Sequence, residues 1–285
     1  MIRATNYFLQ SFCIYLFFAI GFILGIKISR KFFAWIFSTL GPYFKSKKII
    51  NKNLNICYEK TSKFEKEKII KSMWKNYGKT FIEYIFLSDF RKNNFHMNIQ
   101  GEENLYQIAH DAKPVIFVSG HFANFELMSM EITKRKIPLA VIYRPLNNFF
   151  LNFFMEFIRE KYVCHNQIKK GINGVRKAIE FIKKNYSVAL MIDQRVSEGE
   201  KIDFFNKPAF TTTLPAQLSI KFNLDIVPVF IERDDDDKFK IKFYERINPK
   251  NFNNKIDLTK RLNEVLEKMI TKNPNQWIWT HNRWK

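Results

Sequence analysis

The sequence predicts an α/β protein in which a mostly parallel mixed sheet is covered by helices and preceded by an amino-terminal transmembrane helix. Four short apolar runs, at 114–119, 138–144, 188–193 and 225–232, alternate with segments of helical periodicity. Continuous apolar runs are typical of strands buried on both faces, and strands that alternate with helices favour parallel pairing. A separate uncharged stretch at 8–26 predicts the transmembrane helix.

The stretch at 8–26 is nearly as long as a bilayer is thick. Its length at ~1.5 Å per residue is just under the ~30 Å of a hydrocarbon core. A cleaved signal peptide is the alternative, but no small-residue cleavage site follows, and Lys27, Arg30 and Lys31 form a basic flank. Because basic flanks stay in the cytoplasm, we expect a membrane anchor at 1–31 and a cytoplasmic domain at 32–285.

Three further segments have readable patterns. Residues 32–48 are aromatic with a basic end, as in an interfacial helix, although a core helix fits equally well. Residues 64–86 have apolar side chains at spacings of three and four, which predicts an amphipathic helix. Residues 238–246 alternate polar and apolar side chains, which predicts an edge or antiparallel strand.

Composition favours a membrane surface as the partner. The formal net charge of +20 indicates an anionic partner, and the 31 phenylalanines favour lipid over nucleic acid. A biased genome could produce the same composition without a functional cause. The three cysteines have no paired spacing and no ligand cluster near them, so we expect no disulfide, no metal and a reducing compartment. No motif requires a cofactor.

His121 is the strongest candidate for chemistry. It follows the apolar run 114–119 at once, and helical periodicity begins near Asn124. Open α/β sheets place their sites at the carboxyl ends of strands. Glu126 would then lie in the first turn of the next helix, where a carboxylate is favoured. The intervening turn could bring the two side chains together.

A histidine with a carboxylate partner suits acyl transfer to an alcohol. The neutral imidazole removes the hydroxyl proton, and the carboxylate fixes its tautomer. Ser119 is a conceivable nucleophile, but the G-x-S-x-G turn that presents such a serine is missing, so direct attack by the substrate hydroxyl is simpler. A structural histidine capping the sheet is the alternative for His121.

Five ordered blocks, which cover nearly the whole chain, carry a family resemblance. The runs SGHFANFE, VIYRPLNN, LMIDQ, FFNKPAFTTTLPAQL and NPNQWIWTHNRWK together resemble the lipid A biosynthesis (late) acyltransferase family, of the lauroyl and myristoyl transferase type. The resemblance implies that His121 is the general base and Glu126 its partner. It also implies that Arg144 and Asp193 support the site.

The sequence context of Arg144 and Asp193 suggests a role for each residue independently of the resemblance. Pro145 keeps Arg144 extended at a strand end, where its guanidinium could hold a phosphate or orient a thioester. An ordinary surface ion pair is the alternative. Asp193 ends an apolar run and would open onto the same crevice as His121, or would only cap the next turn.

The resemblance also implies the reaction. The donor would be acyl-acyl carrier protein, the acceptor a Kdo-bearing lipid A precursor, and the location the bacterial inner membrane. The implied scaffold is like that of glycerolipid acyltransferases. A glycerophospholipid acyltransferase, acting on lysophosphatidic acid, and a non-catalytic basic membrane-binding protein are the alternatives. His281 in the tail is expected to be structural, and Asn206 and Leu214 stand where the family usually has glycine.

Overall fold

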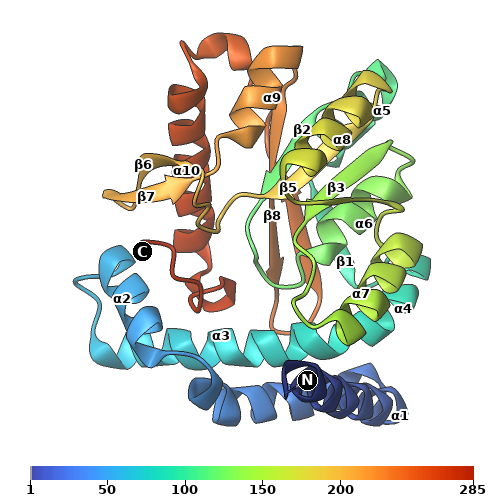
Figure 1. The fold of residues 1–285 in the computed structure, drawn as a ribbon, viewed down its shortest axis with the longest axis vertical. Helices are drawn as coiled ribbons and strands as arrows, with labels where there is room; N and C mark the ends of the chain where they lie inside the picture. The colour runs from blue at the N-terminus through green and yellow to red at the C-terminus, as the bar shows by residue number, and fades with distance from the viewer. Residues whose placement is uncertain (1) are drawn as a thin grey trace.

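A computed structural model describes residues 2–285, with side chains from Ala4 onward. Within this range a seven-stranded sheet has the order β1-β9-β8-β2-β5-β3-β4, and β6 and β7 form a separate two-stranded sheet (Figure 1). The strands are β1 Met97–Gln100, β2 Ile116–Ser119, β3 Leu139–Tyr143, β4 Asn166–Lys169, β5 Ser187–Met191, β6 Glu200–Phe204, β7 Lys207–Thr211, β8 Ile226–Arg233 and β9 Phe239–Phe243.

The sheet is mixed and mostly parallel, as predicted. Strands β8, β2, β5, β3 and β4 are parallel neighbours, and the four apolar runs correspond to β2, β3, β5 and β8. The alternating segment forms β9, which is antiparallel to β8. It is not an edge strand, because β1 pairs with its outer side. Strands β1 and β4 are short and only partly buried, so their sequences lack the apolar run that marks the others.

Helices cover the sheet and close its lower end in Figure 1. They are α1 Ile2–Phe44, α2 Lys47–Cys57, α3 Lys63–Glu83, α4 Leu87–Lys92, α5 Glu102–Asp111, α6 Glu126–Lys134, α7 Phe149–Tyr162, α8 Ile172–Lys183, α9 Leu214–Phe222 and α10 Lys255–Lys272. Short 3-10 turns are η1 Tyr84–Phe86, η2 Pro249–Asn251 and η3 Pro274–Gln276. A capping box of Ser62 and Glu65 starts α3, which matches the predicted amphipathic helix.

Helix α1 consists of two halves that meet at Gly25. The φ of 69° at this residue lies in the left-handed region, which glycine adopts without a steric penalty. An 18-residue stretch within residues 4–44 has a mean hydropathy of 2.2, so this helix is long and apolar enough to cross a membrane. The first half corresponds to the predicted span.

The second half of α1 packs closely against α3. Gly78 of α3 has no side chain at the contact, and a Cβ there would meet the Phe33 carbonyl oxygen at 2.1 Å. Arg30 is buried and pairs with Glu83, so it does not belong to an exposed basic flank. Phe33 is buried while Trp35 is exposed, so the segment at 32–48 has both a core face and a free apolar face.

Candidate functional site

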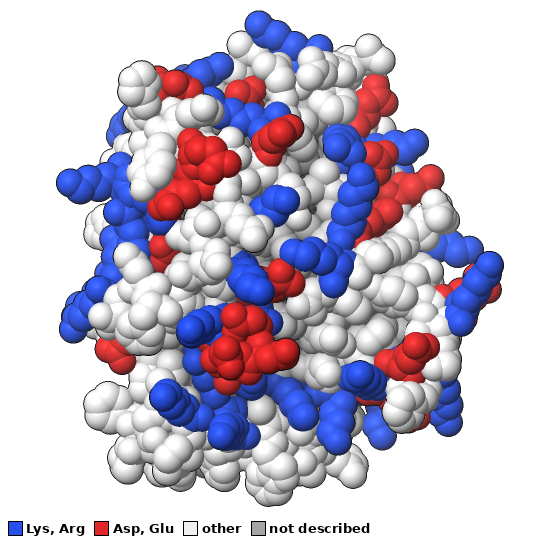
Figure 2. Space-filling model, turned by 180° about the vertical axis from the view of Figure 1, so that it is seen from behind, with Lys and Arg blue, Asp and Glu red and all other residues white. Residues whose placement is uncertain are grey.

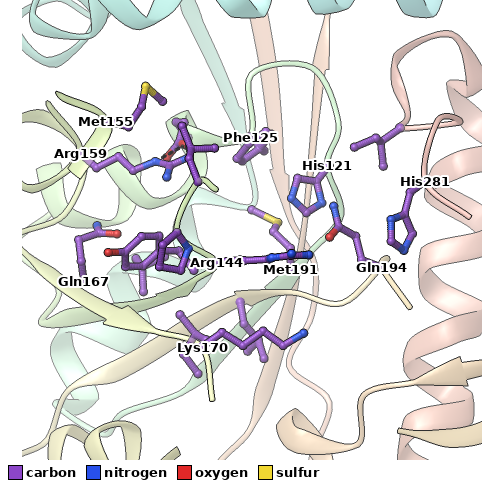
Figure 3. A pocket seen from close by; sticks show the side chains of 18 of the residues that line it. His121, Phe125, Arg144, Met155, Arg159, Gln167, Lys170, Met191, Gln194 and His281 are labelled. Carbon is purple, nitrogen blue, oxygen red and sulfur yellow. Dashed lines mark hydrogen bonds and ion pairs between the residues drawn. The ribbon is translucent and has the colours of Figure 1, made fainter. Parts of the chain in front are cut away.

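The site lies where three neighbouring parallel strands end. His121 follows β2, Asp193 follows β5 and Arg144 follows β3, and these strands are adjacent in the order β2-β5-β3. A cavity of about 710 Å³ opens at this edge, and His121 and Arg144 are among its lining residues (Figure 3). Three of the four predicted residues thus lie at the carboxyl ends of adjacent strands, where open α/β sheets are expected to form their sites.

His121 and Asp193 form a closely bonded pair. Nδ1 of His121 lies 2.7 Å from Oδ1 of Asp193, and the His121 backbone N–H donates to Oδ2 at 2.8 Å. The Trp277 indole N–H also donates to Oδ2, at 2.9 Å. These contacts fix the orientation of both groups. No described residue is hydrogen-bonded to Nε2 of His121, so this nitrogen remains available to a substrate.

The charges of the pair shift both pKa values. Burial alone would lower the pKa of His121, but the charge of Asp193 and the hydrogen bond to it raise that pKa above its ordinary value. Burial alone would raise the pKa of Asp193, but His121 and the Trp277 N–H lower it below its usual range. Asp193 is therefore ionised at neutral pH, and it favours the His121 tautomer that carries its proton on Nδ1.

Glu126 lies at the start of α6, as expected, but its carboxylate is directed to other partners. Oε1 accepts from Nε of Arg159 at 2.7 Å and from the Tyr84 hydroxyl at 2.8 Å. The structure thus gives His121 the carboxylate of Asp193 in place of Glu126. The loop turns at Ala123, where φ is 43°, and the Ala123 N–H donates to the Gln276 carbonyl. Glu126 and Arg159 still line the cavity.

Arg144 is exposed at the cavity, as its place after β3 predicts. No described residue forms an ion pair with it, so the surface ion pair is not seen. Lys45, Lys170 and Arg195 also line the cavity. The carboxylate among the lining residues is Glu126, which Arg159 already neutralises. The cavity therefore carries an excess of positive charge and suits an anionic ligand.

Several residues of the site were not identified from the sequence. Trp277 and Gln276 reach the site from the carboxyl-terminal tail, and Arg159 reaches it from α7. Trp277 lies in one of the five blocks that carry the resemblance, but its partner Asp193 lies 84 positions away in sequence. Only the Trp-rich block itself could have drawn attention to Trp277.

Other candidates have structural roles. His281 accepts a hydrogen bond from the Arg195 backbone N–H at 2.9 Å through Nε2, and burial lowers its pKa. Ser119 is buried, and its hydroxyl donates to the Gly120 carbonyl, so it is not presented as a nucleophile. Leu214 lines the cavity, whereas Asn206 lies in the β6–β7 turn with φ at 55°. Among residues 2–285 no group of three metal-ligating side chains was found.

The family profile and the relatives found by sequence agree on one family. The profile of the family "Bacterial lipid A biosynthesis acyltransferase" matches residues 1–285. The lipid A biosynthesis palmitoleoyltransferase of Escherichia coli K12 is 27% identical over 262 residues, which is 86% of this chain and 80% of that protein. The lauroyltransferase of the same organism is 24% identical over 249 residues, covering 84% of this chain and 78% of its own length.

Two further matches were found. A lipid A biosynthesis acyltransferase of Haemophilus influenzae is 24% identical over 259 residues, covering 89% of this chain and 82% of that protein. Among solved structures, the 1-acyl-sn-glycerophosphate acyltransferase of Thermotoga maritima matches with a TM-score of 0.43 and 15% identity, over 89% of this chain and all of that one. Because the family profile spans the full length, the chain belongs to the bacterial lipid A biosynthesis acyltransferases and is an acyltransferase.

Proposed function

We propose that the enzyme transfers a fatty acyl chain from acyl-acyl carrier protein to a hydroxyl of a Kdo-bearing lipid A precursor. The observation that carries the proposal is the 2.7 Å contact between His121 Nδ1 and Asp193, which leaves Nε2 free at a positively charged cavity. A neutral imidazole held in this way is a general base for a hydroxyl group.

The reaction proceeds in one displacement through a tetrahedral intermediate. Nε2 of His121 takes the proton of the acceptor hydroxyl as its oxygen attacks the thioester carbonyl carbon. The intermediate collapses, the carbon–sulfur bond breaks, and the proton on Nε2 passes to the leaving thiolate. Asp193 stabilises the imidazolium between these two proton transfers. No acyl-enzyme is required.

Cationic side chains suit both substrates. Arg144, Lys170 and Arg195 line the cavity beside His121 and can bind the phosphates of the acceptor. Acyl carrier protein is acidic, so the same excess of positive charge attracts the donor. The Glu126–Arg159 pair holds α6 to α7 at the cavity wall and keeps Arg159 from competing for the phosphates.

The enzyme acts at the cytoplasmic face of the bacterial inner membrane. Helix α1 supports this location because it is long and apolar enough to hold the chain in a bilayer. The anchor at 1–31 and a crossing at 8–26 stay predictions. The high positive charge agrees with an anionic membrane surface, and nucleic acid is not a partner in this proposal.

The test uses the purified full chain in detergent. The protein is incubated with acyl-acyl carrier protein and a Kdo-bearing tetraacylated lipid A precursor, and the lipid is weighed by mass spectrometry. We expect a gain of one acyl chain, lost in His121→Ala and retained in His110→Ala, because His110 is an exposed histidine on α5.

The other outcomes are distinct. Acylation of lysophosphatidic acid in place of the lipid A precursor would move the enzyme to glycerolipid synthesis. Full activity in His121→Ala would refute the general base. Transfer from a pantetheine thioester but not from the carrier protein would refute the proposed donor.

A further inference from the structure

Helix α7 has an apolar stripe that faces away from the protein. Phe149, Phe153 and Phe157 recur every four residues, so they lie on one face of the helix, and all three are exposed. Phe153 is 79% exposed. Met155 and Ile158 lie on the opposite face and are buried. One apolar face of α7 packs on the protein core, so the exposed apolar face is expected to contact another apolar environment.

The stripe is continuous with the first half of α1. The ring of Phe149 contacts Tyr7 with centroids 6.3 Å apart, and Phe150 contacts Phe8 at 5.6 Å. The Tyr15 hydroxyl donates to the Phe150 carbonyl at 2.8 Å. Exposed apolar residues at the start of α1 and on α7, together with Leu146 before α7, form what we call the α1–α7 face: Phe8, Leu9, Phe12, Leu16, Leu146, Phe149, Phe153 and Phe157.

The chemistry of this surface fits a lipid bilayer. It extends the helix whose residues 4–44 are apolar enough to cross a membrane. Figure 2 shows the base of the molecule, which α1 occupies in Figure 1, as largely uncharged with Lys and Arg side chains gathered above it. Lys161 lies over the Phe157 ring at 5.4 Å, at the end of the stripe. Apolar side chains bordered by lysines are typical of helices at an anionic membrane surface.

The same surface reaches the catalytic cavity. Leu146 belongs to the α1–α7 face and also lines the cavity, together with its neighbours Pro145 and Asn147. Lys45, which follows the end of α1, lines the cavity as well. The segment before α7 therefore links the cavity to the α1–α7 face, whereas Lys45 follows the second half of α1, which packs on α3.

We propose that α7 and the first half of α1 enter one membrane leaflet together, in place of a crossing at 8–26, so that the cavity opens at the bilayer surface and the acceptor lipid reaches His121 by lateral movement. The acceptor in this statement rests on the proposed function. Ser11 donates to the Asn148 side-chain oxygen at 3.0 Å, so the start of α7 lies beside the first half of α1. Both α1 and α7 then contact the membrane, so the catalytic domain contributes to the contact together with the anchor.

A depth measurement tests the membrane contact directly. In the full chain with Cys13→Ser and Cys57→Ser, a fluorescent nitrobenzoxadiazole label is placed at Phe153→Cys, or at Ile172→Cys as the control. Ile172 is 78% exposed on α8, which matches Phe153 in exposure. In vesicles of phosphatidylethanolamine and phosphatidylglycerol with nitroxide-labelled acyl chains, we expect quenching at position 153 and none at 172. Equal quenching at the two positions, or none at 153, overturns the proposal.

An activity measurement tests the route of the acceptor. Phe149→Ser, Phe153→Ser and Phe157→Ser are combined and compared with Ile172→Ser. We expect roughly a tenfold lower rate on acceptor embedded in vesicles, because the cavity is no longer held at the surface. The rate on acceptor in detergent micelles should stay near that of the unchanged protein. Equal rates on vesicles, or equal losses in both media, contradict the route. If the unchanged protein acylates no lipid A precursor, the proposed function fails, whereas the depth measurement still decides the membrane contact.

Discussion

Asp193 and Glu83 are both buried carboxylates, but only Asp193 has a basic partner with an atom that reaches the cavity. Glu83 is completely buried and accepts from Arg30 Nε at 2.6 Å, from Arg233 through two nitrogens, and from Asn124 at 3.0 Å. Every one of these partners is itself buried. Asp193 is also buried, but its partner His121 keeps one nitrogen at the cavity.

The comparison separates a structural ion cluster from a candidate catalytic one. Burial alone would raise the pKa of Glu83, but Arg233 and Arg30 lower it, so Glu83 remains charged and joins α1, α3, β8 and the loop after His121. None of the residues of that cluster lines the cavity. A low or high pKa by itself does not mark an active site, whereas a shifted group with an accessible atom is a candidate for one.

The largest effect is expected from Asp193→Asn. An amide has no negative charge to stabilise the imidazolium, and its NH2 group can donate to Nδ1 and impose the wrong tautomer, so kcat should fall by about 10⁴-fold. The measurement is acyl transfer under saturating substrates, with circular dichroism to verify folding. Glu126→Gln is the matched comparison and should lose far less. A larger loss in Glu126→Gln would restore Glu126 as the partner of His121.

Glu83→Ala should damage stability rather than chemistry. The change leaves Arg30 and Arg233 buried without their carboxylate, and breaking a buried pair in this way costs about 3–5 kcal/mol. Urea unfolding in detergent measures the change in the free energy of unfolding. A loss below about 1 kcal/mol would mean that water replaces the carboxylate, and the cluster would not be structural.

Trp277→Phe should lower kcat by roughly tenfold, because Asp193 loses the donor that orients it. The pH profile gives the sharper readout. Activity requires neutral His121, so it falls as the pH drops through the raised pKa of this residue. Without the indole donor, Asp193 attracts the imidazolium more strongly, and the acid limb should move to higher pH. In Asp193→Asn it should move to lower pH. Shifts in the same direction would contradict this account.

The smallest effect is expected at an exposed ion pair. Lys255 and Glu200 lie 3.2 Å apart with both side chains well exposed. Lys255→Ala should change the free energy of unfolding by less than about 0.5 kcal/mol, because water and salt screen the pair. Urea unfolding beside Glu83→Ala gives the contrast between a buried and an exposed ion pair. Equal losses in the two variants would remove the basis of the comparison.

Much of the sheet could be predicted because burial leaves a local signal. Continuous apolar runs identified β2, β3, β5 and β8, and strand ends placed His121, Arg144 and Asp193 at one edge. Strands β1 and β4 left no such signal, since only part of each is buried. Local sequence patterns thus identify buried strands, but they do not identify partly exposed strands at the edges of the sheet.

The partner of His121 could not be obtained from spacing. Glu126 is five positions away, yet the backbone turn at Ala123 sends its carboxylate to Arg159. Asp193 is 72 positions away and reaches His121 because β5 is the parallel neighbour of β2. A sequence gives neighbours along the chain, whereas sheet order decides which strand ends meet.

The docking of the tail on Asp193 sets an order of events during synthesis. Ribosomes extend a chain at roughly 5–20 residues per second, amino terminus first. Helix α1 therefore leaves the exit tunnel long before Gln276 and Trp277, which hold the Ala123 loop and Asp193. The apolar helix is therefore exposed early, whereas the contacts that orient Asp193 and the Ala123 loop form only after the tail has emerged.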